Sequence, residues 1–248
     1  MPKLFNYGTN KQGLIVFGGE TSVDYGMVVA EAPAFERSKR KQTIYNVPGR
    51  NGAVIFQQDA WDDVTRSYRV WLAKDRSDTE LAQLVDAFEA WLNSLTGYQR
   101  LEDSFEPDVF RLAYYSGGIG FSNRLMQAGE ATIAFTCRAE RFLKSGEQVI
   151  EIEDGSQLFN GTRFASKPFI HIEGSGAVTL TINGVTISAN LTDYINIDCE
   201  TMNAYRQPTQ NMNNQIAGTF PTIAPGENAV NITGTVTKAT VIPRFFTI

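Results

Sequence analysis

Apolar and polar residues alternate along most of this chain, which is the period of a β-strand with one buried and one exposed face. The segment SYRVWLA places Tyr68, Val70 and Leu72 on one side of such a strand. The segment EATIAFTC repeats the pattern, with Ala131 and Ile133 on one side. The pattern therefore predicts a mainly β protein.

Two Asn-Gly pairs separate runs of this kind and predict hairpins. Asn51-Gly52 lies between TIYNVPGR and AVIFQQ, and Asn183-Gly184 lies between VTLTI and VTIS. Asn and Gly readily adopt the two positive φ angles that a two-residue type I′ turn requires. We therefore expect a tight hairpin at each pair.

One segment departs from this period and predicts an amphipathic α-helix over about residues 77–96. Its apolar residues recur at three- and four-residue steps and form one broad face, made of Leu81, Leu84, Val85, Phe88, Trp91, Leu92 and Leu95. Ser77 and Glu80 match a capping box, and Gly97 suits the left-handed residue after the last turn. The other face carries Asp78, Gln83, Asp86 and Glu89. We interpret the apolar face as core that packs on a sheet, and not as a cofactor site.

The composition of the chain changes between residues 140 and 160, which indicates two domains. All three tryptophans, the predicted helix and most of the charge precede this point, whereas the rest of the chain is rich in Thr, Asn, Ile and Gly. Short strand segments then follow one another closely, as in a small all-β sandwich. We therefore predict a β-sandwich-like domain with one helix at 1–141 and a β-sandwich at 142–248.

Length and charge narrow the classes of function. A chain of 248 residues with 42% hydrophobic content can bury one large core or two ordinary ones. A net charge of -5 provides no overall positive field for nucleic acid or anionic membranes. No apolar run is long enough to cross a bilayer, and the stretch at 14–17 is too short for a signal-peptide core. We therefore expect synthesis in a cytoplasm, with no membrane and no stable nucleic-acid partner.

Candidate catalytic and metal-ligating residues are few. The single histidine, His171, lies between Ile170 and Ile172 in a strand segment, and no nucleophile motif such as GxSxG accompanies it. We interpret it as a surface histidine. Cys137 and Cys199 have no metal-site spacing and fit separate reduced thiols, half-buried in strands. The sequence thus predicts no catalytic, metal or cofactor site, and it assigns no ligand-binding residue.

Two charged segments each admit a functional and a plain interpretation. The acidic segment carries Glu102, Asp103, Glu106 and Asp108. Paired carboxylates can perform glycoside hydrolysis, but acids that bracket a proline between two strand segments are more typical of a solvated connection. A basic segment, whose functional interpretation is a phosphate contact, carries Arg37, Lys39, Arg40 and Lys41. We expect both segments to be solvated.

Taken in order, these segments resemble the distal tail proteins of siphophages that infect Gram-positive bacteria. DYGMVVAEAPAFERSKRKQTIYNVPGRNGAVIF is similar to the family's opening strands and its Pro-Gly-(Arg/Lys)-Asn-Gly turn. WLNSLTGYQRLEDSFEPDVFRLAYY resembles the family's helix, the strand after it and a Pro-Asp connection, and AFTCRAERF resembles the segment that closes the N-terminal domain. NGTRFASKPFIHIEGSGAVTLTINGV and FPTIAPGENAVNITG are similar to parts of a C-terminal galectin-like sandwich. The resemblance covers nearly the whole chain and rests on the order of the segments, because each alone is only a turn with alternation.

The resemblance implies a structural protein of the virion, located at the phage tail tip, and not an enzyme. Family members form a homo-hexameric ring from their N-terminal domains, carry the C-terminal sandwiches at its periphery, and let DNA pass through. They join the tail tube protein to the tail-associated lysin or baseplate hub protein, and some hold receptor-binding proteins.

One alternative function stays open: a carbohydrate-binding module that recognises host cell-wall sugars through the C-terminal sandwich. Since that domain has no Trp, Tyr194 and Tyr205 would supply the aromatic platform.

Overall fold

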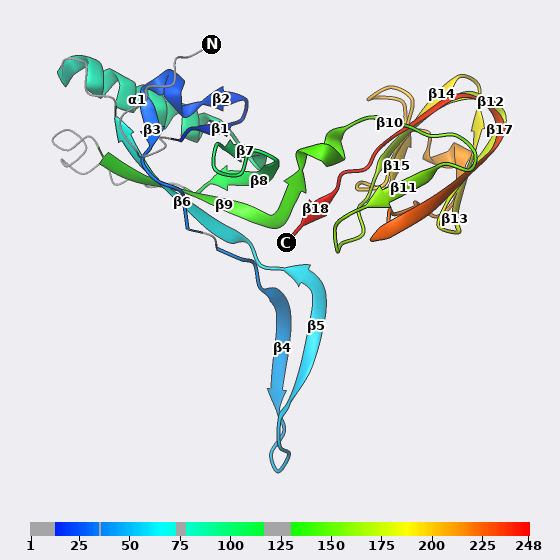
Figure 1. The fold of residues 1–248 in the computed structure, drawn as a ribbon, viewed down its shortest axis with the longest axis horizontal. Coiled ribbons are helices and arrows are strands. Elements are labelled where there is room, and N and C mark those ends of the chain that lie inside the picture. The colour runs from blue at the N-terminus through cyan, green and yellow to red at the C-terminus, as the bar shows by residue number, and fades with distance from the viewer. Residues whose placement is uncertain (1–12, 35, 73–77, 117–129) are drawn as a thin grey trace. The chain divides into compact units, whose positions relative to one another are not determined.

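Strands make up most of the chain in the computed structural model, which describes residues 13–34, 36–72, 78–116 and 130–248 (Figure 1). The chain forms two units, residues 1–141 with Ile248, and residues 142–247. One α-helix lies among the described residues, in the first unit. The prediction of a mainly β fold with a single N-terminal helix is confirmed.

The first unit is built on one antiparallel sheet that curls on itself. Its strands follow the order β2-β1-β7-β8-β9-β6-β3. Their bounds are β1 (Ile15–Phe17), β2 (Glu20–Thr21), β3 (Met27–Val29), β6 (Val64–Leu72), β7 (Gln99–Asp103), β8 (Val109–Tyr115) and β9 (Glu130–Leu143). Gly13 and Val29 exchange two backbone hydrogen bonds of 2.9 and 2.8 Å, so β3 meets the chain just before β1. This closure leaves few free strand edges in the sheet.

Helix α1 (Asp78–Ser94) packs its apolar face on the core of this unit. Phe88 and Trp91 are buried there, and the Trp91 ring stacks on Tyr25 with centroids 4.8 Å apart. The Trp91 indole also donates to the Phe17 carbonyl at 3.2 Å. The helix prediction is therefore confirmed, and the residue expected to follow it, Gly97, has the positive φ of 70°. The capping box of Ser77 and Glu80 lies outside the residues whose side chains the structure describes.

Among the described residues, strands β4 (Arg40–Asn46) and β5 (Ala53–Trp61) pair only with each other. They form a two-stranded ribbon, called the arm below (Figure 1). The predicted hairpin at this place is confirmed, but the predicted two-residue turn at Asn51-Gly52 is wrong. Pairing stops at Asn46 and Ala53, and the Arg50 amide donates to the Val47 carbonyl at 3.2 Å. Pro48 and Gly49, whose φ is 79°, occupy the two central positions of that turn. A Pro-Gly pair is well suited to a type II turn, and it sets the end of the hairpin in place of Asn-Gly.

The second unit is a β-sandwich built from a second sheet. Its main strand order is β10-β17-β12-β13-β16; β11 pairs with β17, β14 pairs with β12, and β15 pairs with β14. The bounds are β10 (Ile150–Glu151), β11 (Gln157–Asn160), β12 (Phe169–Ile182), β13 (Val185–Leu191), β14 (Tyr194–Asp198), β15 (Asn203–Tyr205), β16 (Ile216–Gly218) and β17 (Gly226–Ile242). A last short strand, β18, spans Phe246–Thr247. The predicted tight turn at Asn183-Gly184 is confirmed, because these residues join β12 to β13 with φ values of 50° and 78°.

The two long strands β12 and β17 bend, so that one sheet supplies both layers of this sandwich. The first half of β12 pairs with β14, and its second half pairs with β13. The register between β12 and β17 shifts at Gly174, where an added Cβ would lie 2.3 Å from the Thr235 carbonyl oxygen. Glycine is therefore needed for the close approach of the two backbones at the bend. Isoleucines such as Ile170, Ile172 and Ile182 alternate toward the buried core on either side of it.

Candidate functional site

The arm exposes large apolar side chains that no other part of the described chain covers. Ile44, Tyr45, Ile55 and Phe56 have between 53% and 59% of their surface exposed. The cross-strand pair of Ile44 with Ile55 lies on one face, and Tyr45 lies on the other with Phe56, their ring centroids 5.6 Å apart. Both faces of the ribbon are therefore apolar. A two-stranded ribbon of this kind is marginal in water by itself, so it is a candidate interaction surface.

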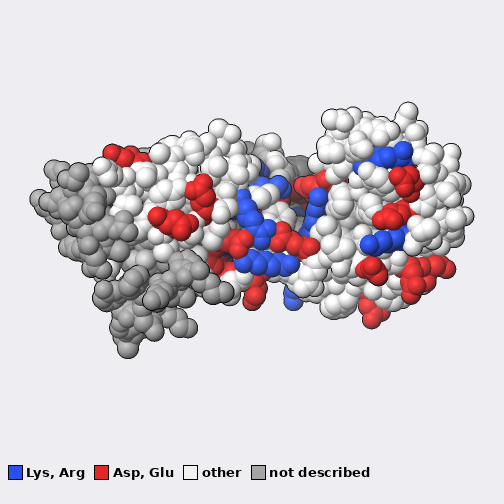
Figure 2. Space-filling view, turned by 90° about the horizontal axis from the view of Figure 1, so that it is seen from above, with Lys and Arg blue, Asp and Glu red and all other residues white. Residues whose placement is uncertain are grey.

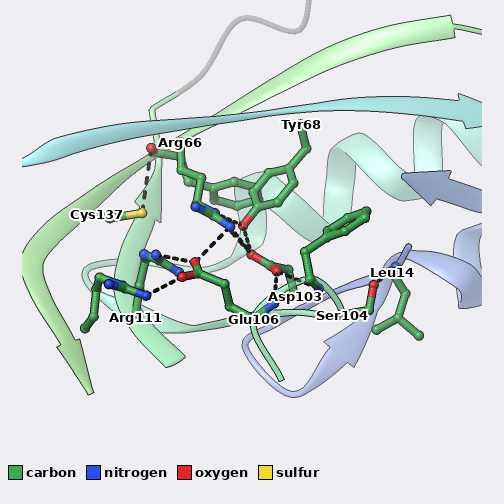
Figure 3. Close-up of polar contacts among 11 residues, drawn as sticks. Leu14, Arg66, Tyr68, Asp103, Ser104, Glu106, Arg111 and Cys137 are labelled. Carbon is green, nitrogen blue, oxygen red and sulfur yellow. Dashed lines mark hydrogen bonds and ion pairs between the residues drawn. The ribbon is translucent and has the colours of Figure 1, made fainter. Parts of the chain in front are cut away.

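A buried ionic cluster lies in the first unit, where side chains from four neighbouring strands meet (Figure 3). Asp103, at the end of β7, accepts from the Arg66 guanidinium at 2.8 Å and from the Tyr68 hydroxyl at 2.8 Å. Both partners come from β6 and are buried. The second carboxylate oxygen of Asp103 accepts from the backbone amides of Phe105 and Glu106 at 2.9 and 3.0 Å. All four hydrogen bonds stabilise the ionised form of the carboxylate.

Glu106 extends the cluster from the turn between β7 and β8. Its carboxylate contacts Arg66 at 3.1 Å and Arg111, on β8, at 2.5 Å. It also pairs with Arg141, on β9. The cluster thus joins β6, β7, β8 and β9 through two acids and three arginines. Removing one partner from such a buried network leaves an uncompensated charge and destabilises the fold.

The electrostatics of the cluster agree with this geometry. Burial by itself raises the pKa of Asp103, but the charge of Arg66 and the hydrogen bonds from Tyr68 and Arg66 outweigh burial and hold that pKa below its ordinary value. The pKa of Glu106 is lowered in the same way, burial being outweighed by Arg111, Arg141 and Arg66. The pKa of the Tyr68 hydroxyl is raised well above its usual range by burial and by Asp103. Both carboxylates are therefore ionised at neutral pH.

The predicted solvated state of the acidic segment is wrong for Asp103 and Glu106. Asp103 ends β7 and Glu106 lies in the connection after it, but both side chains point inward and pair with arginines that lie far away in the sequence. Asp108 is exposed, in agreement with the prediction. The cluster does not fit glycoside hydrolysis, because that reaction needs one carboxyl group held protonated by its surroundings. Here both acids have a lowered pKa.

The remaining candidates from the sequence lie apart from this cluster. His171 alternates with the buried Ile170 and Ile172, as predicted, and its ring nitrogens contact Asn196 at 2.7 Å and Glu173 at 3.1 Å. Among the described residues, no group of three or more His, Cys, Asp or Glu side chains is placed to hold a metal ion. No helix in the same residues has the length and apolarity to span a bilayer.

Both cysteines are free and fully buried, each in the core of its own unit. They are therefore more deeply buried than the half-buried thiols that we expected. Burial raises the pKa of the Cys137 thiol to about 11 and that of Cys199 to about 12. Thiols of this kind are poor nucleophiles at neutral pH.

The exposed basic segment begins the arm. Arg40 pairs with Asp59 at 3.5 Å, and its guanidinium lies over the Trp61 ring at 5.1 Å. On the face drawn in Figure 2, Lys and Arg side chains are interspersed with Asp and Glu, and no large patch of one sign is visible. Arg37, Lys39, Arg40 and Lys41 are all exposed, so the sequence placed this segment correctly on the surface.

Two features of the site were missed from the sequence. The first is the pairing of Asp103 and Glu106 with buried arginines, which nothing in the neighbouring sequence indicates. The second is the exposed apolar surface of the arm, which does have a local sequence signal, because TIY and VIF each place apolar residues next to one another. Adjacent apolar residues in a strand point to opposite faces, so both faces of such a ribbon need a cover.

Comparison with known proteins identifies the architecture. No protein-family model matches the chain, and no curated protein sequence matches it. The solved structures include the Dit (gp 19.1) protein of SPP1, described as a paradigm of the hub adsorption apparatus in phages that infect Gram-positive bacteria. It is similar to this chain with a TM-score of 0.75 and 13% sequence identity, over 95% of this chain and 99% of that one.

The chain has the Dit fold. The likeness extends through both units, and the resemblance read from the order of the sequence segments is thereby confirmed for the fold. The low identity explains why no single motif carried that resemblance. In the described part of the first unit, the arm and the ionic cluster stand out because core packing alone does not explain them.

Proposed function

We propose that this protein is a structural component of a phage tail, a distal tail protein that forms a homo-hexameric ring at the tail tip. The observation that carries the proposal is the Dit fold over nearly the whole chain, shared with a protein described as an adsorption hub. The first unit builds the ring, and the second unit is a galectin-like sandwich at its periphery. The protein acts through assembly and not through catalysis.

The exposed arm provides the contact for assembly. A closed ring requires a heterologous interface, in which a surface of one copy meets a different surface of the next. A ribbon that is apolar on both faces suits this role, because the next copy in the ring can bury its exposed side chains while the fold of each copy stays unchanged. Burying each of its large apolar side chains contributes about 1.5–3 kcal/mol. The arm is therefore the part of the first unit on which ring formation depends.

The assembly proposal predicts the effect of charging the arm. Lysines in place of Ile44 and Phe56 put one charge on each face, so we expect the double variant I44K/F56K to be monomeric at micromolar concentration. The wild-type chain is expected to form a hexamer or a multiple of it. Size-exclusion chromatography with light scattering measures both. The melting temperature should change little, since neither residue belongs to a core.

A matched control places the same two charges on exposed apolar residues elsewhere. Val149 and Phe159 have 63% and 69% of their surface exposed in the second unit. The V149K/F159K variant should assemble as the wild type does. A monomeric wild-type protein, or an I44K/F56K variant that still forms rings, contradicts the proposed role of the arm.

Within this proposal the ring joins the tail tube protein to the tail-associated lysin or baseplate hub protein, and it holds receptor-binding proteins where these are present. DNA passes through the ring without being held. Each Lys or Arg that neutralises a phosphate adds salt-dependent affinity, which would slow that passage. A net charge of -5 per chain and the pairing of Arg40 with Asp59 both oppose such contacts.

We therefore expect no measurable binding of a short DNA duplex by the free protein at physiological salt. Fluorescence anisotropy of a labelled duplex, titrated first at low and then at physiological salt, provides the measurement. The control replaces Arg37, Lys39, Arg40 and Lys41 with Gln. Micromolar binding that persists at physiological salt and disappears in this variant would overturn the idea of a passive conduit.

A further inference from the structure

An open pocket of about 460 Å³ lies in the second unit, beside strand β15 and the loop after it. It is lined by Thr201, Asn203, Ala204, Tyr205, Pro208, Thr209 and Asn211. Its volume falls in the range of small-molecule sites, about 300–1,000 Å³. The pocket is not part of the arm or of the ionic cluster, and neither feature explains it.

Most residues that line this pocket are polar, and none of them carries a charged side chain. Its polar groups are two threonine hydroxyls, two asparagine amides and one tyrosine hydroxyl, beside the apolar ring of Pro208. The side-chain oxygens of Asn203 and Asn211 accept from the Asn213 side chain at 3.0 Å and the Asn213 backbone at 2.8 Å. Their NH₂ groups make no hydrogen bond within the described part of the chain. They are therefore available as donors to a ligand.

The loop that forms the pocket is held in place by hydrogen bonds. Asn213 accepts from the Ala204 amide at 2.6 Å, in addition to its contacts with Asn203 and Asn211. The Met212 amide donates to the Ala204 carbonyl at 2.8 Å, and the Arg206 amide donates to the Gln210 carbonyl at 3.1 Å. These bonds close the loop onto β15. A pocket that is ordered before binding does not lose the free energy of ordering its walls.

Tyr205 forms the aromatic side of the pocket and is itself supported. Its backbone pairs with Asn196 on β14, and its ring lies 6.4 Å from the Phe169 ring between centroids. Asn196 in turn contacts His171 at 2.7 Å and donates to the Arg206 carbonyl at 3.1 Å. The hydrogen bonds of Asn196 to His171 and to the Arg206 carbonyl therefore help to hold β15 and Tyr205 in position.

We propose that this pocket binds a neutral pyranose sugar. A pyranose offers an apolar C–H face for the Tyr205 ring and hydroxyls that both donate and accept, which matches threonine and asparagine groups. An anionic ligand finds no positive charge in the lining, and an apolar ligand would leave the polar groups unpaired. The pocket thus gives a location and a ligand class to the carbohydrate alternative, independently of ring formation.

Saturation-transfer difference NMR on the full-length chain tests this inference. The probes are methyl α-glucopyranoside, methyl β-galactopyranoside and N-acetylglucosamine at concentrations on the order of 1–10 mM, which suit weak single-site binding. We expect at least one sugar to receive saturation from the wild-type protein. Tyr205→Ala should weaken its binding about tenfold through loss of the stacking ring. Thr209→Val, which removes one exposed hydroxyl, should weaken it about threefold.

Phe159→Ala is the matched control, because it removes an exposed aromatic ring from the same unit outside the pocket. Its sugar signal should equal that of the wild type. Absence of signal from all three sugars overturns the inference, as does equal signal from wild type and from both pocket variants. Since Thr209 is exposed, its variant tests the site even if Tyr205→Ala unfolds. Loss of sugar binding and loss of ring formation are separate readouts, so either proposal can fail alone.

Discussion

Replacing Asp103 with Ala is expected to lower the free energy of unfolding of the first unit by about 3–5 kcal/mol. The substitution leaves the buried Arg66 guanidinium and the Tyr68 hydroxyl without their acceptor, and it removes the acceptor of two backbone amides. Urea denaturation followed by tryptophan fluorescence measures this unit specifically, because Trp61, Trp71 and Trp91 all belong to it.

Asp108→Ala provides the matched control, since this acid lies in the same turn region but is exposed. Its effect should be within about 0.5 kcal/mol. An Asp103→Ala variant as stable as the control would mean that the buried cluster contributes little to the fold.

The cluster should also affect how the free energy of unfolding depends on pH. The pKa values of Asp103 and Glu106 are lower in the folded state than their ordinary values of 3.8 and 4.5. Their ionisation therefore stabilises the fold fully above those ordinary values, and the contribution is lost as the pH falls through the folded values. The wild-type protein should lose stability in that acid range, and the Asp103→Ala variant should lose less. A pH dependence that is unchanged in the variant contradicts the assignment.

Phe88→Ala is expected to destabilise the first unit by about 3–5 kcal/mol as well, because it opens a cavity in a packed core. The Phe88 side chain is fully buried, and its ring lies 5.5 Å from Trp91 and 6.1 Å from Tyr25 between centroids. The tryptophan transition should shift, and ring formation should fail, while the second unit keeps its β-sheet signal in circular dichroism. Gln83→Ala, on the exposed face of the same helix, should leave both unchanged.

A Phe88→Ala variant that melts at the wild-type temperature would show that the helix does not hold this core together. If both units instead unfold in one transition, the two cores are coupled in solution. The fluorescence and circular dichroism curves would then coincide.

The elements of this fold were largely predictable because their signals are local. Period-2 alternation identified β6 and β9, and a 3.6-residue period identified α1. The Asn183-Gly184 turn was predictable for the same reason, since two positive φ angles are required within two residues. The error at Asn51-Gly52 also has a local cause. A competing Pro-Gly turn at 48–49 lies just before it, and the two signals favour different hairpin ends.

The sequence by itself thus determined the strands, the helix and the order of segments that resembles the Dit fold. Only the tertiary structure decided which charges are buried, because Arg66 and Asp103 meet although they are 37 residues apart in the chain. It also decided that the apolar residues of the arm stay uncovered while similar residues in β6 are buried. Burial depends on what packs above a strand, and the period of the strand does not contain that information. The pocket at Tyr205 has the same origin, since a loop folding back on β15 brings its hydroxyl and amide groups together.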